Sequence, residues 1–217
     1  MNNIPIFTAV NGMATLILKE VPVCGRAYVM LRSVWNGKTA ALLEECAQFC
    51  RAVGAEEIFA CDDGNELPAE AAYEVVELSI SKDALPKPQK PVELVPLRQD
   101  NSAEYLRIFN GCFRDLHSAA SYGPADIRRL LGKDLAFLAR VDGQYAGIAE
   151  LGDNYLEAVA VLPQFRGLGF DLTASVLAKL PGPVVRLKVA STNERALRLY
   201  RRMGFGEDRT VRKWFRL

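Results

Sequence analysis

The sequence predicts a mixed α/β (α+β) fold in which helices flank a mostly antiparallel sheet. Short apolar runs typical of strands flank Asn11-Gly12 and Asp142-Gly143, two dipeptides that favour hairpin turns. Between the strand-like runs lie segments whose apolar residues recur at helical spacing. Residues 82–96 hold four prolines and three lysines, a composition that resists both helix and strand and indicates a linker. The chain therefore reads as two units that meet near residue 90.

Composition and charge favour a soluble globular protein. Half of the 217 residues are hydrophobic, 24% are charged and the net charge is +1, so nothing global points to nucleic acid or an acidic membrane surface. No apolar run approaches the roughly 20 residues that a membrane helix needs. The first residues lack the basic and apolar regions of a signal peptide. We therefore expect a cytoplasmic protein that binds neither nucleic acid nor membrane.

The cysteines and the single histidine favour neither a metal centre nor a disulfide framework. The five cysteines include no C-x-x-C spacing. Cys46 and Cys50 are four residues apart and would share one helix face as a reduced, buried pair. His117 has no companions at zinc-ligand spacing, and no G-x-S-x-G motif accompanies it for a serine hydrolase. We expect no metal cofactor, and we expect His117 at a helix end on the surface.

The first unit is expected to form a hairpin, a third strand, a helix and two further strands. Residues 39–54 have helical spacing and close at Gly54, a predicted helix cap. The predicted strands are residues 4–10, 13–21, 26–34, 56–62 and 71–81.

The second unit places a strand and two helices before a similar series. In the first of these helices, four apolar residues are expected to form the buried face: Leu106, Phe109, Cys112 and Phe113. The predicted strands are residues 92–97, a hairpin over 135–151, then 154–163, 184–190 and 208–217. The predicted helices are residues 101–119, 123–133, 170–180 and 193–205.

The two units resemble each other in the order of their elements. Residues 6–20 and 136–151 each read as strand, Asn/Asp-Gly turn and strand, and each is followed by a strand, a helix and a strand. This order predicts a tandem of one architecture. The first copy lacks the opening helices and any Arg-Gly-x-Gly turn. The alternative is that hairpins are common enough to coincide.

The most specific feature is the turn PQFRGLGFDL, residues 163–172. A predicted strand ends there and a helix begins, and the first amides of a helix have no internal partner and carry partial positive charge. Gly167 and Gly169 let the backbone approach a ligand, and Arg166 adds a cation. Together they predict a pyrophosphate cradle. Leu172 stands where a Rossmann motif has its third glycine, and no Lys-Ser/Thr follows, so a nucleotide site is the weaker interpretation.

Residues 164–169, QFRGLG, fit the Q/R-x-x-G-x-G/A signature of the GNAT superfamily of N-acetyltransferases, which the chain resembles. After a further strand, residues 193–205 continue the resemblance with the pattern N-x-x-A-x-x-L-Y-x-x-x-G-F. The resemblance covers about residues 91–217. It implies a GNAT-like fold, with a GNAT acetyl-CoA-binding catalytic domain at 91–217 and a degenerate GNAT-like domain at 1–88.

The resemblance also implies that acetyl-CoA is the co-substrate and indicates where it binds. Main-chain groups of the strand before the turn would hold the pantetheine arm, the turn amides would hold the pyrophosphate, and Asn193 would bond the arm. The implied cofactor-binding residues are Val159, Ala160, Val161, Gln164, Arg166, Gly167, Leu168, Gly169, Phe170, Asn193, Ala196 and Tyr200.

Acetyl transfer from a thioester to an amine needs a neutral amine, a polarised carbonyl and a proton for the departing sulfur. Tyr200 stands where the family often has the general acid, and a phenol suits this role. A strand amide near Val159 would donate to the carbonyl oxygen. Two residues are candidates for the general base. Glu157 is one, because strand alternation places it on the face of Val159. Glu150, at the end of the previous strand, is the other. Each is otherwise a solvated surface carboxylate.

Two positions of the turn depart from the family pattern. Asp171 stands where relatives more often carry glycine or a small neutral residue, and we expect it to face away from the diphosphate. Phe170 is bulkier than usual and is expected to pack beneath the turn. Basic residues of the second helix either form a solvated face or attract the phosphates. They are Arg198, Arg201 and Arg202.

The leading hypothesis is an N-acetyltransferase that transfers the acetyl group of acetyl-CoA to a primary amine of a small molecule or peptide, by direct attack in a ternary complex. The alternative is a non-catalytic acyl-CoA-binding sensor or scaffold module. No acidic or aromatic cluster in the sequence identifies the amine. The first unit would cover the acceptor cleft, mediate a homodimer or complete the fold of the second.

Overall fold

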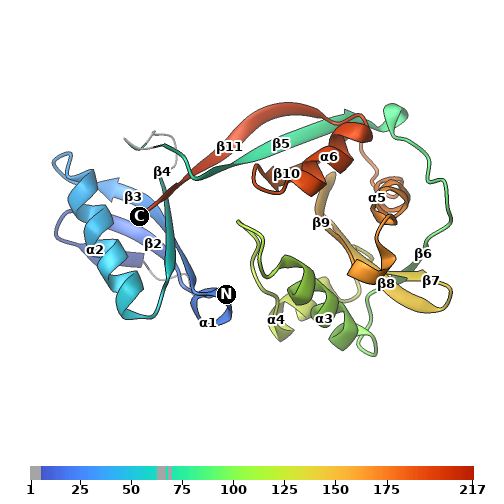
Figure 1. Ribbon diagram of the computed structural model, residues 1–217, viewed down its shortest axis with the longest axis horizontal. Helices are drawn as coiled ribbons and strands as arrows, with labels where there is room; N and C mark the ends of the chain where they lie inside the picture. Colours follow the sequence, from blue (N-terminus) through green and yellow to red (C-terminus); the bar gives the residue numbers. More distant parts are fainter. Residues whose placement is uncertain (1–5, 63–66, 68–69) are drawn as a thin grey trace. The chain divides into compact units, whose positions relative to one another are not determined.

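The computed structural model describes residues 6–62, 67 and 70–217. The chain divides into two compact units, residues 1–75 with 210–217 and residues 76–209, and its elements are drawn in Figure 1. These bounds differ from the predicted domains at 1–88 and 91–217, because strands β5 and β11 each run from one unit into the other. A division by contacts does not test independent folding, so the domain bounds stay a prediction.

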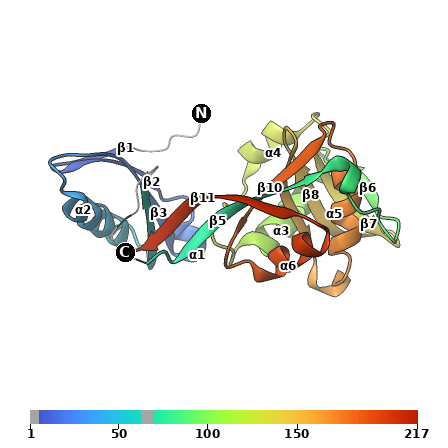
Figure 2. The same cartoon turned by 90° about the horizontal axis from the view of Figure 1, so that it is seen from above.

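In the first unit, one long helix packs on one face of a sheet, as Figure 2 shows for α2. The strand order is β1-β2-β3-β4-β11; β3 and β4 are parallel, and the other recorded pairs are antiparallel. The elements are β1 (Ile6–Ala9), β2 (Gly12–Ile17), α1 (Val21–Cys24), β3 (Arg26–Val34), α2 (Thr39–Ala52), β4 (Glu57–Asp62), the start of β5 (Tyr73–Ser81) and the end of β11 (Gly206–Arg216).

The predicted strands and helix of this unit are observed, although predicted strand 13–21 ends at Ile17 and the first residues of predicted strand 4–10 lie outside the described residues. The short helix α1 was not predicted from the sequence.

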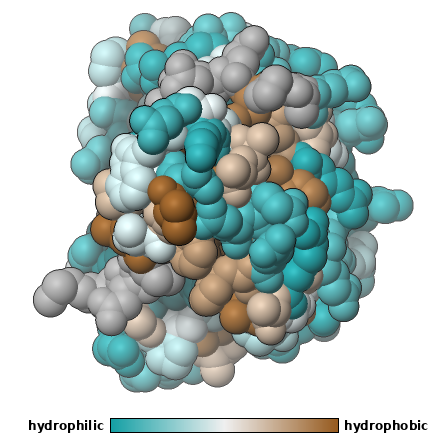
Figure 3. Space-filling model, turned by 90° about the vertical axis from the view of Figure 1, so that its left-hand side faces the viewer, coloured by the Kyte–Doolittle hydropathy of each residue, from teal (hydrophilic) through white to brown (hydrophobic). Residues whose placement is uncertain are grey.

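Cys46 and Cys50 are both fully buried against the sheet and unbonded to each other. Burial raises the pKa of Cys46 to about 12, so its thiol stays protonated. Figure 3 shows one face of the molecule, where hydrophilic and apolar side chains are mixed.

In the second unit, helices cover both faces of a sheet with the strand order β11-β5-β10-β9-β8-β7-β6. Apart from the parallel pair β9 and β10, the recorded pairs of β6 to β9 are antiparallel. The further elements are η1 (Lys82–Ala84), β6 (Glu93–Pro96), α3 (Ser102–Phe113), α4 (Pro124–Leu130), β7 (Ala136–Val141), β8 (Gln144–Leu151), β9 (Tyr155–Val161), η2 (Pro163–Phe165), α5 (Gly169–Leu177), β10 (Val184–Ala190) and α6 (Glu194–Arg202).

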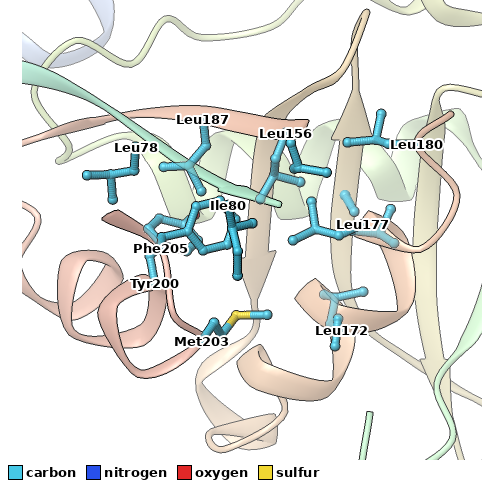
Figure 4. Packing of buried hydrophobic residues seen from close by; sticks show 14 of the residues in the cluster. Leu78, Ile80, Leu156, Leu172, Leu177, Leu180, Leu187, Tyr200, Met203 and Phe205 are labelled. Atoms are coloured by element: carbon cyan, nitrogen blue, oxygen red, sulfur yellow. The ribbon is translucent and has the colours of Figure 1, made fainter. Parts of the chain in front are cut away.

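Two apolar clusters lie on opposite faces of this sheet. Phe137 and Ala149 belong to the cluster with α5 and α6, whereas their neighbours Leu138 and Ile148 belong to the cluster with α3 and α4, as the alternation of a strand requires. Figure 4 shows α5 and α6 side chains in the first cluster. The four residues predicted for the buried face of α3 all pack in the second cluster, Phe109 buried and Leu106, Cys112 and Phe113 partly buried. The prediction missed Tyr105 and Ile108, which are buried as well.

The two units share one connectivity. β1-β2-β3-α2-β4 and β7-β8-β9-α5-β10 are both a hairpin, a third antiparallel strand, a helix and a strand parallel to the third. The predicted fold class, a mixed, mostly antiparallel sheet flanked by helices, is confirmed, and the shared connectivity agrees with the predicted tandem of one architecture. Among the described residues, no helix is long and apolar enough to cross a membrane.

Candidate active site

The parallel strands β9 and β10 separate soon after they meet. They pair only through Tyr155 with Arg186 and Leu156 with Leu187. Beyond these residues, the edge of β9 that faces β10 has no ladder partner among the residues that the structure describes, while β8 pairs with the other edge as far as Val161. Unpaired backbone inside a sheet leaves N–H and C=O groups for a ligand. The predicted pantetheine-binding residues lie on this stretch, at Val159, Ala160 and Val161.

A β-bulge interrupts β9 beside this opening. Leu151 of β8 is opposite Leu156, and the next residue of β8, Glu150, is opposite Ala158. Glu157 is therefore the extra residue of the bulge, which shifts the alternation of the strand.

The bulge corrects the predicted place of Glu157. Strand alternation predicted that it shares a face with Val159, but Val159 and Val161 pack with the α5 and α6 cluster. Glu157 is exposed, and its carboxylate lies over the β8–β9 turn, since a Cβ added at Gly152 would be 2.6 Å from Glu157 Oε1. This placement makes Glu157 a weak candidate for the base.

The turn at the end of β9 has free space and free amides. Gly167 has a φ of 108°, a conformation that favours glycine, and nothing lies within 4 Å of the position of a Cβ there. The amides of Phe165 and Leu168 donate to backbone carbonyls. Within the described part of the chain, the structure records no hydrogen bond from the amides of Gly167, Gly169 and Phe170.

The side chains of the turn leave it open to an anion. Gln164 and Arg166 are exposed, and Leu168 packs against the core below. Arg166 makes no ion pair within the described residues. Three amides without a partner, a glycine with empty space around it and an unpaired cation fit a diphosphate. The residues present therefore fit the coenzyme that the resemblance implies.

Helix α6 begins at the carboxyl end of β10, as the turn begins at the carboxyl end of β9. Asn193 caps α6, because its side-chain oxygen accepts from the amide of Ala196 at 3.2 Å. Leu199 of α6 packs against the turn, 3.4 Å from where a Cβ of Gly169 would lie.

Tyr200 lies in the core cluster below α6. Its side chain is 7% exposed, and its ring centroid is 5.7 Å from that of Phe205 (Figure 4). Burial raises the pKa of the Tyr200 phenol well above its usual value, so it is protonated at neutral pH. The structure records no hydrogen bond of this hydroxyl within the described residues, yet it is not among the fully buried unpaired atoms. The hydroxyl oxygen of Tyr200 is therefore not completely shielded from solvent.

Glu150 is the centre of a buried polar network. It is 2% exposed, and the Tyr105 hydroxyl donates to its Oε2 at 3.3 Å. Arg129 of α4 donates to Oε1 at 3.4 Å. Burial raises the pKa of Glu150, and the contacts with Tyr122, Arg129 and Tyr105 offset that effect only in part. Glu150 lies opposite Ala158, so this network adjoins the bulge.

The partners of Glu150 have no signature in the sequence. Tyr105 has the spacing of a core residue of α3, and Tyr122 stacks on Phe109 with ring centroids 3.7 Å apart. In the sequence, Arg129 looks like an ordinary charged residue of a short predicted helix. No local motif links these residues, because helix packing on β8 brings them together. Among the described residues, no three His, Cys, Asp or Glu side chains form a metal site.

Parallel strands that splay apart, with a glycine turn of free amides at the end of one strand, are the arrangement that the resemblance to the acetyltransferases implies. Residues 102–205 match the model of the acetyltransferase (GNAT) family. The second unit of the chain therefore belongs to this family. No curated protein matches the chain.

Solved structures share the fold of the chain at low sequence identity. A GCN5-related N-acetyltransferase from Sphaerobacter thermophilus has a TM-score of 0.61 at 16% identity, covering 94% of this chain and 76% of that one. A functionally unknown conserved protein from Staphylococcus epidermidis has a TM-score of 0.59 at 14% identity, covering 98% and 94%. A GCN5-related N-acetyltransferase from Kribbella flavida has a TM-score of 0.52 at 18% identity, covering 96% and 88%. At these identities the likeness concerns the fold alone.

Proposed function

We propose that the chain is an N-acetyltransferase that transfers the acetyl group of acetyl-CoA to a primary amine of a small molecule or peptide in the cytoplasm. The observation that carries the proposal is the unpaired edge of β9 beside a turn whose amides have no partner. Membership of the acetyltransferase family supports it. Acetyl-CoA supplies an activated acetyl group as a thioester, and the chain supplies the binding and the proton transfers.

The pantetheine arm would bond the backbone of Val159, Ala160 and Val161 as an added strand. The diphosphate would accept hydrogen bonds from the amides of Gly167, Gly169 and Phe170, and Arg166 would add its charge. The family resemblance further assigns Gln164, Leu168, Asn193, Ala196 and Tyr200 to this site.

Glu150 is the better candidate for the base of the two carboxylates. A base that accepts a proton from an ammonium group works best with a pKa closer to neutral than a free carboxylate has, and burial moves the pKa of Glu150 in this direction. Its carboxylate is engaged by Tyr105 and Arg129, so the proton would reach it through a water molecule or a tyrosine hydroxyl. Glu157 is exposed over the turn at Gly152 and is not held beside β9 by any contact recorded within the described residues.

Tyr200 is the proposed general acid. A phenol kept protonated by burial has a proton to give as the thiolate departs. No carboxylate or carbonyl is recorded as an acceptor of its hydroxyl within the described residues, so no competing bond would need to break. The strand amide near Val159 would stabilise negative charge on the carbonyl oxygen.

Titration calorimetry with acetyl-CoA tests the binding part of this proposal. We expect one acetyl-CoA to bind per chain with a dissociation constant in the micromolar range. This constant corresponds to a binding free energy of about −8 kcal/mol. No heat and no thermal shift at millimolar acetyl-CoA would refute it. Release of the coenzyme A thiol across a panel of amines and amino-terminal peptides then tests transfer.

A non-catalytic acyl-CoA-binding module is the second candidate. The observation that favours it is the degree of burial of Tyr200 and Glu150, at 7% and 2% exposed, which restricts direct contact with substrates. Acetyl-CoA that binds tightly, with no thiol release above the uncatalysed rate for any amine of the panel, would favour this candidate over the enzyme.

A further inference from the structure

Arginine side chains of α6 differ in whether they have an acidic partner. Arg198 pairs with Glu194 at 2.9 Å, and Arg201 lies 3.9 Å from Glu207. Arg202, the last residue of the helix, makes no ion pair within the described residues. Its guanidinium instead lies over the ring of Phe170, 5.2 Å from the centroid, a distance typical of a cation–π contact.

Phe170 therefore places an arginine beside the cofactor turn. Phe170 is the residue after Gly169, and its amide is one of the three without a partner. The contact of Leu199 with the position of Gly169 fixes the same face of α6 against the turn. The bulky residue that departs from the family pattern thus contacts a cation of α6, and this residue directly follows Gly169.

Asp171, the second departure, holds the linker at the same turn. Its Oδ1 accepts from the amide of Gln89 at 2.6 Å and from the amide of Lys90 at 3.1 Å. Asp171 is 7% exposed, and its carboxylate is engaged by these two linker amides. The backbone of Lys90 is therefore fixed at the first turn of α5. Lys90 is exposed and makes no ion pair within the described residues.

We propose that Phe170 and Asp171 are positioning residues that hold Arg202 and Lys90 beside the cofactor turn, where these two cations bind the 3′-phosphate of coenzyme A. This inference rests on the proposed function. The turn amides and Arg166 already suffice for the diphosphate, so further cations at its rim suit a second phosphate. A phosphate monoester carries nearly two negative charges at neutral pH, and arginine can bind it through two hydrogen bonds.

Comparison of coenzyme A with dephospho-coenzyme A tests the two cations, because the second ligand lacks the 3′-phosphate and keeps the diphosphate. We expect calorimetry of the parent to show about tenfold tighter binding of coenzyme A, as charge-assisted contacts imply. Arg202→Gln and Lys90→Gln should each lower this preference by about threefold. Lys133→Gln removes an equal charge from an exposed loop of the second unit and should leave the preference unchanged.

Substitutions of the positioning residues separate this role from a structural one. Phe170→Leu should lower the preference for coenzyme A as much as Arg202→Gln does, and the double variant should add little, since both changes break one contact. Phe170→Tyr keeps the aromatic face and should restore the preference. Asp171→Ala should lower the preference as Lys90→Gln does, and should speed hydrogen exchange at the amides of residues 89 and 90.

The outcomes distinguish this inference from the proposed function. A parent that binds coenzyme A and dephospho-coenzyme A equally well would overturn the inference and leave the proposed function standing. So would variants of Arg202 and Lys90 that weaken both ligands by the same factor. A parent that binds neither of these ligands nor acetyl-CoA would overturn the proposed function, and this inference with it.

Discussion

The parallel strand pairs of the two units differ in how far they stay together. In the first unit, β3 and β4 pair over six residues, from Arg26 with Glu57 to Leu31 with Asp62. In the second unit, the corresponding β9 and β10 pair over two. The same connectivity therefore gives a closed sheet in one unit and an open strand edge in the other.

The turns that follow the third strand of each unit differ in the same sense. Residues 35–38, Trp-Asn-Gly-Lys, lead into α2 with one glycine, whereas residues 164–169 lead into α5 with two and an arginine. Glu150 lies as many residues after the hairpin glycine Gly143 as Lys19 lies after the hairpin glycine Gly12, so the two positions correspond. The segment between β4 and β5, residues 63–72, is also shorter than residues 191–205, which contain α6. Among the described residues, the same connectivity thus occurs in the first unit without the splay and without the two-glycine turn, whereas the second unit has both and follows them with α6.

The largest effect is expected from filling the cofactor turn. Gly167→Val introduces a β-branched side chain at a positive φ and fills the empty space beside the free amides. We expect the affinity for acetyl-CoA to fall by about a hundredfold or more, measured by calorimetry, which corresponds to about 3 kcal/mol.

Gly37→Val is the matched control in the first unit. Gly37 also has a positive φ, 68°, and also has nothing within 4 Å of a Cβ position. Both variants should lose about 1–3 kcal/mol of the free energy of unfolding through backbone strain, but Gly37→Val should leave the affinity for acetyl-CoA unchanged. Equal losses of affinity in both variants would contradict a site confined to the second unit.

The next largest effect is expected on catalysis, from replacing Glu150, whose counterpart in the first unit is a lysine. Glu150→Gln should lower kcat/KM by about a hundredfold near neutral pH, because an amide cannot accept the proton of the amine. Glu157→Gln should change kcat/KM by less than about twofold. Steady-state rates of thiol release measure both, and the reverse ranking would transfer the role of base to Glu157.

A smaller effect is expected at Tyr200. Tyr200→Phe keeps the ring packed on Phe205 and removes only the hydroxyl, so we expect kcat to fall by about tenfold while KM for acetyl-CoA stays within about twofold. An unchanged kcat across the pH range would remove Tyr200 from the role of acid and leave it as a core residue.

Local patterns predicted much of this molecule, and long-range pairing decided the rest. Hairpin turns and helical spacing are set by neighbours in the sequence, so the fold class, the glycine turn and most of the elements were predicted, while the short helix α1 was missed. The bulge at Glu157 depends on register with β8, which strand alternation alone does not reveal. The network of Glu150 needs α3 and α4 packed on the sheet, and the hydrogen bonds of Asp171 reach residues 89 and 90, so neither has a local signature.

The smallest effect is a pH dependence of stability that Glu150 should impart to the second unit. Burial raises its pKa above the ordinary 4.5, so the stability that the neutral form contributes is present below this value and is lost as the pH rises through the raised pKa. Glutamine at this position does not titrate. The free energy of unfolding of the parent, relative to Glu150→Gln, should therefore fall as the pH rises from acid to neutral, measured by urea unfolding. Lys19→Gln, the matched variant of the first unit, should show no such trend, since it leaves Glu150 and its network in place. A difference that grows with pH would mean that attraction to Arg129 outweighs the cost of burial, and would argue against Glu150 as the base.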